Sequence, residues 1–242
     1  MVEVLIAGDS QTGALFHRVR RHPNVALVAA PGQRVKNFQI TPDGQVTGYE
    51  VQLNSPAAPA LHRFDLAYIY ADMAEPLTLM PKRLHRYSAA YLAAHVTERL
   101  QDSHSIRLAR AMAQVLPPRR IILIPKPIPL SRARAGFAAM TLQDATARVQ
   151  RHIGFPIAHL TSGICAPDGT PDPAFYENSA DWLGEIPKPD TKPDHDNDHL
   201  NTRGGDLLFE AFKRDVAARF IPARGNRHRS SPPAHPTPPP PP

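Results

Sequence analysis

The chain has 242 residues, of which 42% are apolar, and a formal net charge of +6. This length suffices for one sizeable α/β domain or two small ones, and no apolar stretch approaches the roughly 20 residues of a membrane helix. Three of the positive charges are arginines within residues 223–231, and the rest of the chain lacks the interleaved aromatic and basic residues of RNA-binding modules. Composition therefore argues against membrane insertion and against specific nucleic-acid binding.

Apolar runs and helical periodicities alternate along the first 220 residues. Four continuous apolar runs predict buried strands, and a fifth, which contains Pro156, predicts a weaker one. Residues 38–53 alternate around a Pro-Asp-Gly turn and predict a hairpin. In chain order we expect strands at 2–8, 25–30, 64–71, 120–125 and 155–162, and helices at 11–21, 83–116 (divided near Asp102-Ser103), 142–154 and 203–220.

Two of these helices carry an apolar stripe at helical spacing, formed by Leu108, Ala111, Met112 and Val115 in one and by Phe209, Phe212, Val216 and Phe220 in the other. Strands that are apolar throughout and alternate with helices predict a parallel sheet covered on both faces. The sequence therefore predicts an α/β domain over residues 1–222.

Residues 223–242 form a basic segment followed by a proline-rich end. Eight of the chain's 28 prolines lie in its last eleven residues. This composition predicts a disordered tail with polyproline II character, which is a candidate for binding a protein partner.

At the amino-terminal end, the first apolar run is about five residues long, shorter than the roughly 7–15 residues of a signal-peptide core. With Cys165 as the only cysteine, this predicts a cytoplasmic protein.

The stretch IAGDSQTGAL, residues 6–15, follows the first predicted strand, where parallel sheets bind ligands. Gly8 and Gly13 have the spacing of a phosphate-binding loop, but Ala-Leu follows instead of Lys and Ser/Thr. A dinucleotide fingerprint also fails, because Ser10 stands where its second glycine is needed. Ser10 is therefore a candidate nucleophile, with capping of the next helix as its structural alternative.

A serine nucleophile needs a base, and the base needs a group that orients it. The segment DHDNDHLNTRGG, residues 194–205, precedes the last predicted helix and places Asp196 three residues before His199. One turn of chain brings such a carboxylate onto the imidazole Nδ1–H and leaves Nε2 to face a serine. Asp9, beside Ser10, is expected instead to bind backbone N–H groups of its turn.

Gly-Asp-Ser after the first strand, with Asp-x-x-His and His-Leu-Asn before the last helix, resembles the SGNH, or GDSL-type, hydrolases. The resemblance implies a flavodoxin-like three-layer sandwich of about five parallel strands with helices on both faces. It implies Ser10 as nucleophile, His199 as general base and Asp196 as its orienting group. It also implies the backbone N–H groups of Ser10 and Gly32 as oxyanion donors.

The resemblance fails after the third strand, where the family has Gly-x-Asn-Asp and this chain reads IYADMAE at residues 69–75. An ionised Asp72 there would repel an oxyanion, and loss of one oxyanion donor costs about 100- to 1000-fold in rate. Asn37, in the loop after Gly32, is the candidate substitute donor. A protonated Asp72, or a protein with weak or no activity, are the alternatives.

The aspartates of residues 194–198 alternate as in a calcium loop, but His199 and Gly205 stand where an EF-hand needs glycine and glutamate. A zinc site with His195 and His199 lacks a third imidazole or thiolate nearby in the sequence. We therefore expect neither a metal nor an organic cofactor.

Together these residues predict an esterase or deacylase that cleaves an O-acetyl or short acyl ester of a small molecule or carbohydrate. Two alternatives stay open. An O-acyltransferase would use the same residues on a different acceptor, and a binding protein would keep the fold without efficient chemistry.

Overall fold

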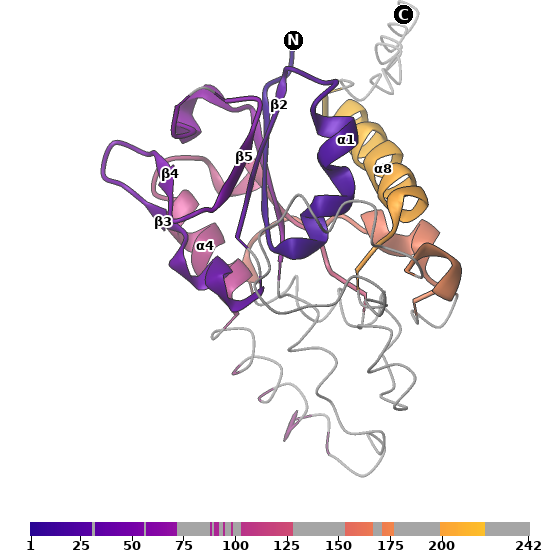
Figure 1. The fold of residues 1–242 in the computed structure, drawn as a ribbon. Coiled ribbons are helices and arrows are strands. Elements are labelled where there is room, and N and C mark those ends of the chain that lie inside the picture. The colour runs from indigo at the N-terminus through magenta and orange to yellow at the C-terminus, as the bar shows by residue number, and fades with distance from the viewer. Residues whose placement is uncertain are drawn as a thin grey trace, which may run out of the picture.

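A computed structural model describes residues 1–30, 32–55, 57–71, 88, 90, 91, 94, 98, 103–127, 153–166, 171–176 and 199–220. Among them, one five-stranded sheet has the order β5–β2–β1–β6–β7 (Figure 1). The strands are β1 (Val4–Gly8), β2 (Val25–Ala29), β5 (Val51–Leu53), β6 (Leu66–Tyr70) and β7 (Ile121–Leu123). All neighbouring strands pair in parallel except β5, which runs antiparallel to β2 at the edge of the sheet. The protein is therefore a mixed α/β protein with a mostly parallel sheet.

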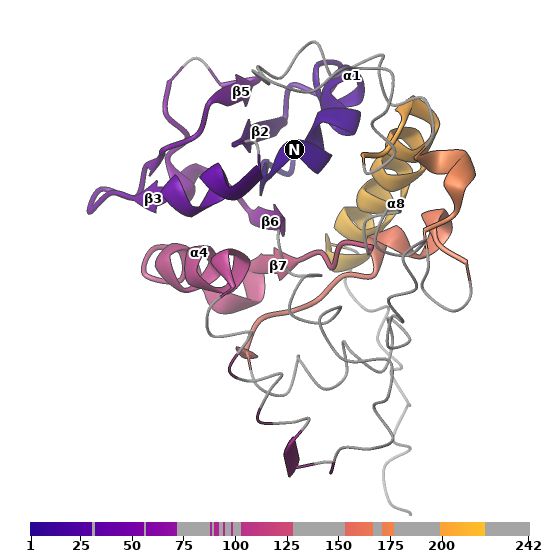
Figure 2. The same ribbon diagram turned by 60° about the horizontal axis from the view of Figure 1, so that its bottom comes forward.

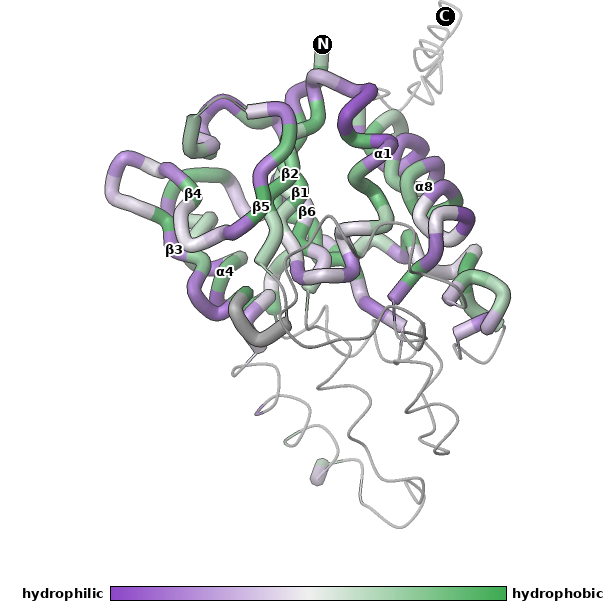
Figure 3. The backbone as a smooth tube through the Cα atoms, viewed as in Figure 1, coloured by the Kyte–Doolittle hydropathy of each residue, from purple (hydrophilic) through white to green (hydrophobic). Residues whose placement is uncertain are grey.

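The four parallel strands are apolar runs because both of their faces are covered. Every residue of β1, β2, β6 and β7 is buried. Within β1, Leu5 and Ala7 pack into a core with α4 (His104–Met112), whereas Val4 and Ile6 pack with α1 (Phe16–Val19) and α8 (Thr202–Phe220). Figure 2 shows α4 on one side of the sheet and α1 and α8 on the other. Figure 3 shows the apolar strands between these helices.

The prediction of a fifth parallel strand at residues 155–162 is wrong. The chain there meets β7 through a single bridge between Leu123 and Ile157. Two hydrogen bonds support the bridge, from Leu123 N to Pro156 O (2.9 Å) and from Ala158 N to Leu123 O (2.9 Å). Pro156 has no N–H to extend a ladder, and the 3-10 helix η6 (Leu160–Ile164) begins soon afterwards.

The hairpin predicted at residues 38–53 forms only near its turn. β3 (Gln39–Ile40) and β4 (Val46–Thr47) pair around Gly44, whose φ is 81°. Gly48 follows with a φ of 78°, and a Cβ at this position would lie 1.9 Å from Asn37 O, so only glycine fits. Beyond Gly48 the chain leaves the hairpin, and its predicted second arm becomes β5 of the main sheet.

The helix predicted over 11–21 is tighter than expected. It consists of the 3-10 helix η1 (Ser10–Leu15), followed by the short α1. The last helix agrees with its prediction, except that α8 buries Phe209 and Phe212 while Phe220 is 44% exposed. The apolar stripe therefore ends before the carboxyl end of α8.

The helix α4 begins directly after Ser103, as predicted, and buries Leu108 and Met112. Residues 142–152 of the helix predicted at 142–154 and much of the region 83–102 lie outside the described residues, as does the tail. The described part of the chain contains no helix with the length and apolar character needed to cross a membrane.

Candidate active site

Ser10 stands at the carboxyl edge of the sheet, directly after β1 and the Asp9 turn. The order of the strands reverses between β1 and β6, which is where open parallel sheets bind their ligands. The last residue of β1, Gly8, must be glycine because a Cβ there would lie 2.4 Å from Tyr70 O and 2.3 Å from Thr12 Cγ2. Asp9 N donates to the same Tyr70 oxygen (3.2 Å), which fastens the turn to β6.

Asp9 caps η1, the helix that Ser10 begins. Its Oδ1 accepts a hydrogen bond from Gln11 N (2.9 Å), and its carbonyl oxygen accepts from Thr12 N (3.1 Å) and Thr12 Oγ1 (2.7 Å). Asp9 is buried, with 5% exposure. The Asp9 carboxylate therefore binds one backbone N–H group of its turn, that of Gln11, as expected.

His199 lies opposite Ser10 although 189 residues separate them. Ser10 Oγ and His199 Nε2 are 2.7 Å apart, within hydrogen-bond distance. Ser10 is 8% exposed and His199 is half-buried. The structure therefore brings together the predicted nucleophile and the predicted base, with Nε2 as the ring atom that faces the hydroxyl.

The position of His199 depends on the start of α8. Asn201 caps this helix, because its Oδ1 accepts from Gly204 N (3.0 Å). Asn201 N donates to Phe175 O (2.8 Å) and its Nδ2 donates to Ala174 O (3.0 Å), both in the 3-10 helix η7 (Pro173–Phe175). The chain just after His199 is thus held against η7.

Two glycines let the first turn of α8 approach the serine loop closely. A Cβ at Gly205 would lie 2.1 Å from Ala14 O in η1. A Cβ at Gly204 would lie 2.8 Å from Phe175 O in η7. The glycine pair that ends the segment 194–205 is therefore part of what places His199 beside Ser10, a role that the sequence did not reveal.

The structure describes only two of the other predicted site residues, Gly32 and Asn37. Asp196 and Asp72 lie outside the described residues. Gly32 begins the 3-10 helix η2 (Gly32–Asn37), which follows β2. Asn37 ends η2 with an exposed side chain, and its carbonyl oxygen faces Gly48 of the hairpin. Among the described residues no hydrogen bond joins Asn37 to Ser10, so its role as oxyanion donor stays a prediction.

Lys126 is a residue of this site that sequence reasoning missed. It follows β7, and its Nζ forms an ion pair with Asp9 Oδ2. The Lys126 side chain is 17% exposed and the Asp9 side chain 7%. The available signal was position alone: a lysine just past an apolar strand, at the edge where Ser10 lies.

Two buried tyrosines lie in the core on the α8 side of the sheet. Tyr70 ends β6 and is 1% exposed, and Tyr176 is 2% exposed. Within the part of the chain that the structure describes, neither hydroxyl has a hydrogen-bond partner. Burial raises the pKa of both hydroxyls well above the ordinary value, and the Asp9 charge raises that of Tyr70 further. Both phenols are therefore neutral.

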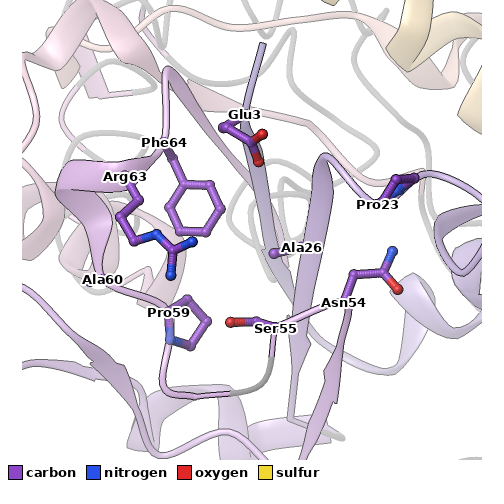
Figure 4. A pocket seen from close by; sticks show the side chains of 9 residues that line it. All are labelled: Glu3, Pro23, Ala26, Asn54, Ser55, Pro59, Ala60, Arg63 and Phe64. Carbon is purple, nitrogen blue, oxygen red and sulfur yellow. The ribbon is translucent and has the colours of Figure 1, made fainter. Parts of the chain in front are cut away.

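A pocket of about 100 Å³ lies at the opposite edge of the sheet. Figure 4 shows Arg63 and Phe64 across this pocket from Asn54. Glu3, which precedes β1, also lines the pocket. The serine and histidine pair lies at the carboxyl ends of the strands, so this pocket is not where a substrate of that pair would bind.

No cluster of three or more His, Cys, Asp or Glu side chains suited to a metal ion occurs in the described ranges. The aspartates and His195 considered for a calcium or zinc site lie outside those ranges, and only His199 is described.

Comparisons with known proteins do not assign a family. No family model and no curated protein matches the chain. The crystal structure of the lipase/acylhydrolase from Enterococcus faecalis is similar over 93% of this chain and 100% of that chain, with a TM-score of 0.42 and 14% sequence identity. This TM-score is too low to carry an argument, so the function is inferred from the geometry of Ser10 and His199.

Proposed function

We propose that the protein is a serine hydrolase of the SGNH type, with residues 1–222 as its catalytic domain, and that it cleaves an acyl ester. The observation that carries this proposal is the 2.7 Å separation of Ser10 Oγ and His199 Nε2 at the carboxyl edge of the sheet. A serine hydroxyl becomes an effective nucleophile when a base within hydrogen-bond reach takes its proton. His199 Nε2 has that position.

In the proposed reaction Ser10 Oγ attacks the carbonyl carbon of the ester while His199 Nε2 accepts its proton. The imidazolium then protonates the leaving alkoxide oxygen as the bond to the acyl carbon breaks. A water then attacks the acyl-enzyme carbonyl while His199 Nε2 takes its proton. The imidazolium returns this proton to Ser10 Oγ as the acyl–serine bond breaks, which releases the carboxylic acid and restores Ser10. Throughout this cycle Nδ1 must keep its proton, a task that we assign to Asp196.

The tetrahedral oxyanion would form between the ends of β1 and β2. We assign its stabilisation to the backbone N–H groups of Ser10 and Gly32. β1 and β2 are neighbouring parallel strands, which supports placing both groups at one edge of the sheet. Donors aimed at developing charge supply much of the rate enhancement in acyl transfer.

One alternative follows if the Asn37 side chain, which is exposed at the end of η2 beside the hairpin, does not reach the oxyanion. The oxyanion would then have only the two backbone donors. A protein with two donors would turn over slowly, and one that retained only ester binding would be a binding protein. A measurement of ester turnover distinguishes a slow hydrolase from a binding protein.

The test is hydrolysis of p-nitrophenyl acetate and butyrate by the wild-type chain, by Ser10→Ala and by Ser55→Ala. Ser55 lines the pocket at the opposite edge of the sheet and is the matched control. We expect burst kinetics in the wild type and the control, and no burst in Ser10→Ala. A folded wild-type protein that releases no p-nitrophenol above the rate of Ser10→Ala would contradict hydrolysis and favour the binding protein.

A further inference from the structure

Three elements of the sheet edge converge on Asp9. Its backbone N donates to Tyr70 O at the end of β6, and its Oδ1 accepts from Gln11 N in η1. Its Oδ2 pairs with Lys126, which follows β7. Both carboxylate oxygens are therefore engaged, one by the serine loop itself and one by a different part of the sheet.

The pair of Asp9 with Lys126 differs from the other ion pairs between described residues in its burial. Its side chains are 7% and 17% exposed, whereas those of Arg219 and Asp215 are 22–26% exposed. Burying a charge is unfavourable unless its partner is held in good geometry, so such a pair fixes the groups that carry it. An exposed pair has little such effect.

Gln11 extends this connection to the histidine. Its Oε1 accepts a hydrogen bond from Leu200 N (3.4 Å), and Leu200 is the neighbour of His199. Ser10 lies between Asp9, which Lys126 holds, and Gln11, which touches the histidine turn. The three residues 9–11 thus join the end of β7 to the start of α8 through side-chain contacts.

We propose that Lys126 is a positioning residue: through Asp9 it fixes the serine loop so that Ser10 Oγ stays within reach of His199 Nε2. The catalytic role of Lys126 rests on the proposed function. The position of Ser10 relative to His199, however, can be measured without turnover. Misplacement of a nucleophile by 1 Å costs about 100-fold in rate, so a small shift of the loop has a large consequence.

The experiment compares the wild type with Lys126→Met, which removes the charge and keeps the length of the side chain. Isotope-labelled histidine reports the nitrogen resonances of His199 by NMR, and Ser10→Ala provides the spectrum of a histidine that has lost the serine. Arg219→Met is the control, because it breaks an ion pair near the far end of α8. The rate of labelling by a fluorophosphonate probe is measured in parallel.

We expect Lys126→Met to move the His199 Nε2 resonance toward its position in Ser10→Ala and to slow labelling by about 10- to 100-fold. Arg219→Met should change neither. Lys126→Arg, which keeps a cation near Asp9, should restore most of the labelling rate. Wild-type resonances and labelling in a folded Lys126→Met protein would overturn the proposal.

Lys126→Met leaves a buried carboxylate without its cation and can fail to fold for that reason. The double variant Asp9→Asn/Lys126→Met removes both charges and keeps an oxygen for Gln11 N. We expect it to fold with the His199 resonance still displaced. If it restores the wild-type resonance, Lys126 serves only to balance charge and the positioning role is wrong.

The NMR comparison also separates the two proposals. A wild-type protein that is neither labelled nor active contradicts the proposed hydrolase. The shift of the His199 resonance in Lys126→Met would still show that Lys126 positions the serine loop, and its absence would overturn that role.

Discussion

The two edges of the sheet use their polar side chains in different ways. At the amino edge these side chains mostly bind backbone. The Asn54 amide approaches three carbonyl oxygens, those of Val19 (2.5 Å), His22 (3.0 Å) and Val25 (3.1 Å). Such contacts close turns and satisfy backbone groups that the strands leave behind.

At the carboxyl edge polar side chains instead meet one another across the chain. Ser10 faces His199, and Asp9 pairs with Lys126 from 117 residues away. A pair of side chains held from distant segments gains little stability for its cost in burial, but it places reactive groups accurately. The comparison teaches that substitutions at the amino edge should affect stability, whereas those at the carboxyl edge should affect activity.

His199→Ala should give the largest effect. Loss of the proposed base should lower ester hydrolysis by about 10⁴- to 10⁶-fold, as removal of a triad member does in serine proteases. The half-buried imidazole contributes little to packing, so the urea midpoint should stay near that of the wild type. His62→Ala, at an exposed histidine near the opposite edge, is the control and should keep full activity. Equal rates for the two variants would remove His199 from the mechanism.

Gly205→Ala should break the contact that brings the histidine turn to the serine loop. The new methyl group would lie 2.1 Å from Ala14 O, so α8 must move away from η1. We expect a loss of about 1–3 kcal/mol in the free energy of unfolding and a fall in activity of about 100-fold. Gly163→Ala, where no atom lies within 4 Å of the added group, should leave both unchanged. Full activity in Gly205→Ala would show that the close approach is not needed.

Asn54→Ala should be the reverse case, a stability effect without an activity effect. Asn54 has a φ of 58°, so alanine there adds backbone strain as well as removing the amide. We expect a loss of about 1–2 kcal/mol by urea unfolding, with unchanged activity per folded molecule. Asn54→Gly relieves the strain and isolates the contribution of the amide. A loss of activity in the folded variant would break the distinction between the two edges.

Tyr176→Phe should give a small effect of opposite sign. Removing a buried hydroxyl without a partner removes its desolvation penalty, so the free energy of unfolding should rise by about 1 kcal/mol. Calorimetry should show a higher melting temperature than in the wild type. A lower melting temperature would show that the hydroxyl makes a stabilising hydrogen bond.

The sequence predicted the parallel strands well because burial on both faces leaves a continuous apolar run, as in β1 and β6. It failed where one residue changes the path of the chain. Pro156 reduced the fifth strand to one bridge, and Gly48 redirected the hairpin's second arm into the main sheet. A periodic pattern of apolar residues does not show where the chain leaves a strand or a hairpin.

Ser10 and His199 were singled out from the sequence because each stands in a short motif beside a predicted element. Lys126 stands in no motif, and its partner lies 117 residues away, so only the folded chain brings the two together. The same holds for Gly205, whose role depends on Ala14 of another helix. Residues that act through contacts between distant segments are those that patterns along the chain miss.

The most direct test of the proposed nucleophile is to treat the folded wild-type protein with a fluorophosphonate and to locate the adduct by peptide mass spectrometry. We predict a single adduct on Ser10, which disappears when the protein is unfolded before labelling because His199 no longer faces the hydroxyl. An adduct on another residue, or no adduct on the folded protein, would contradict an activated Ser10.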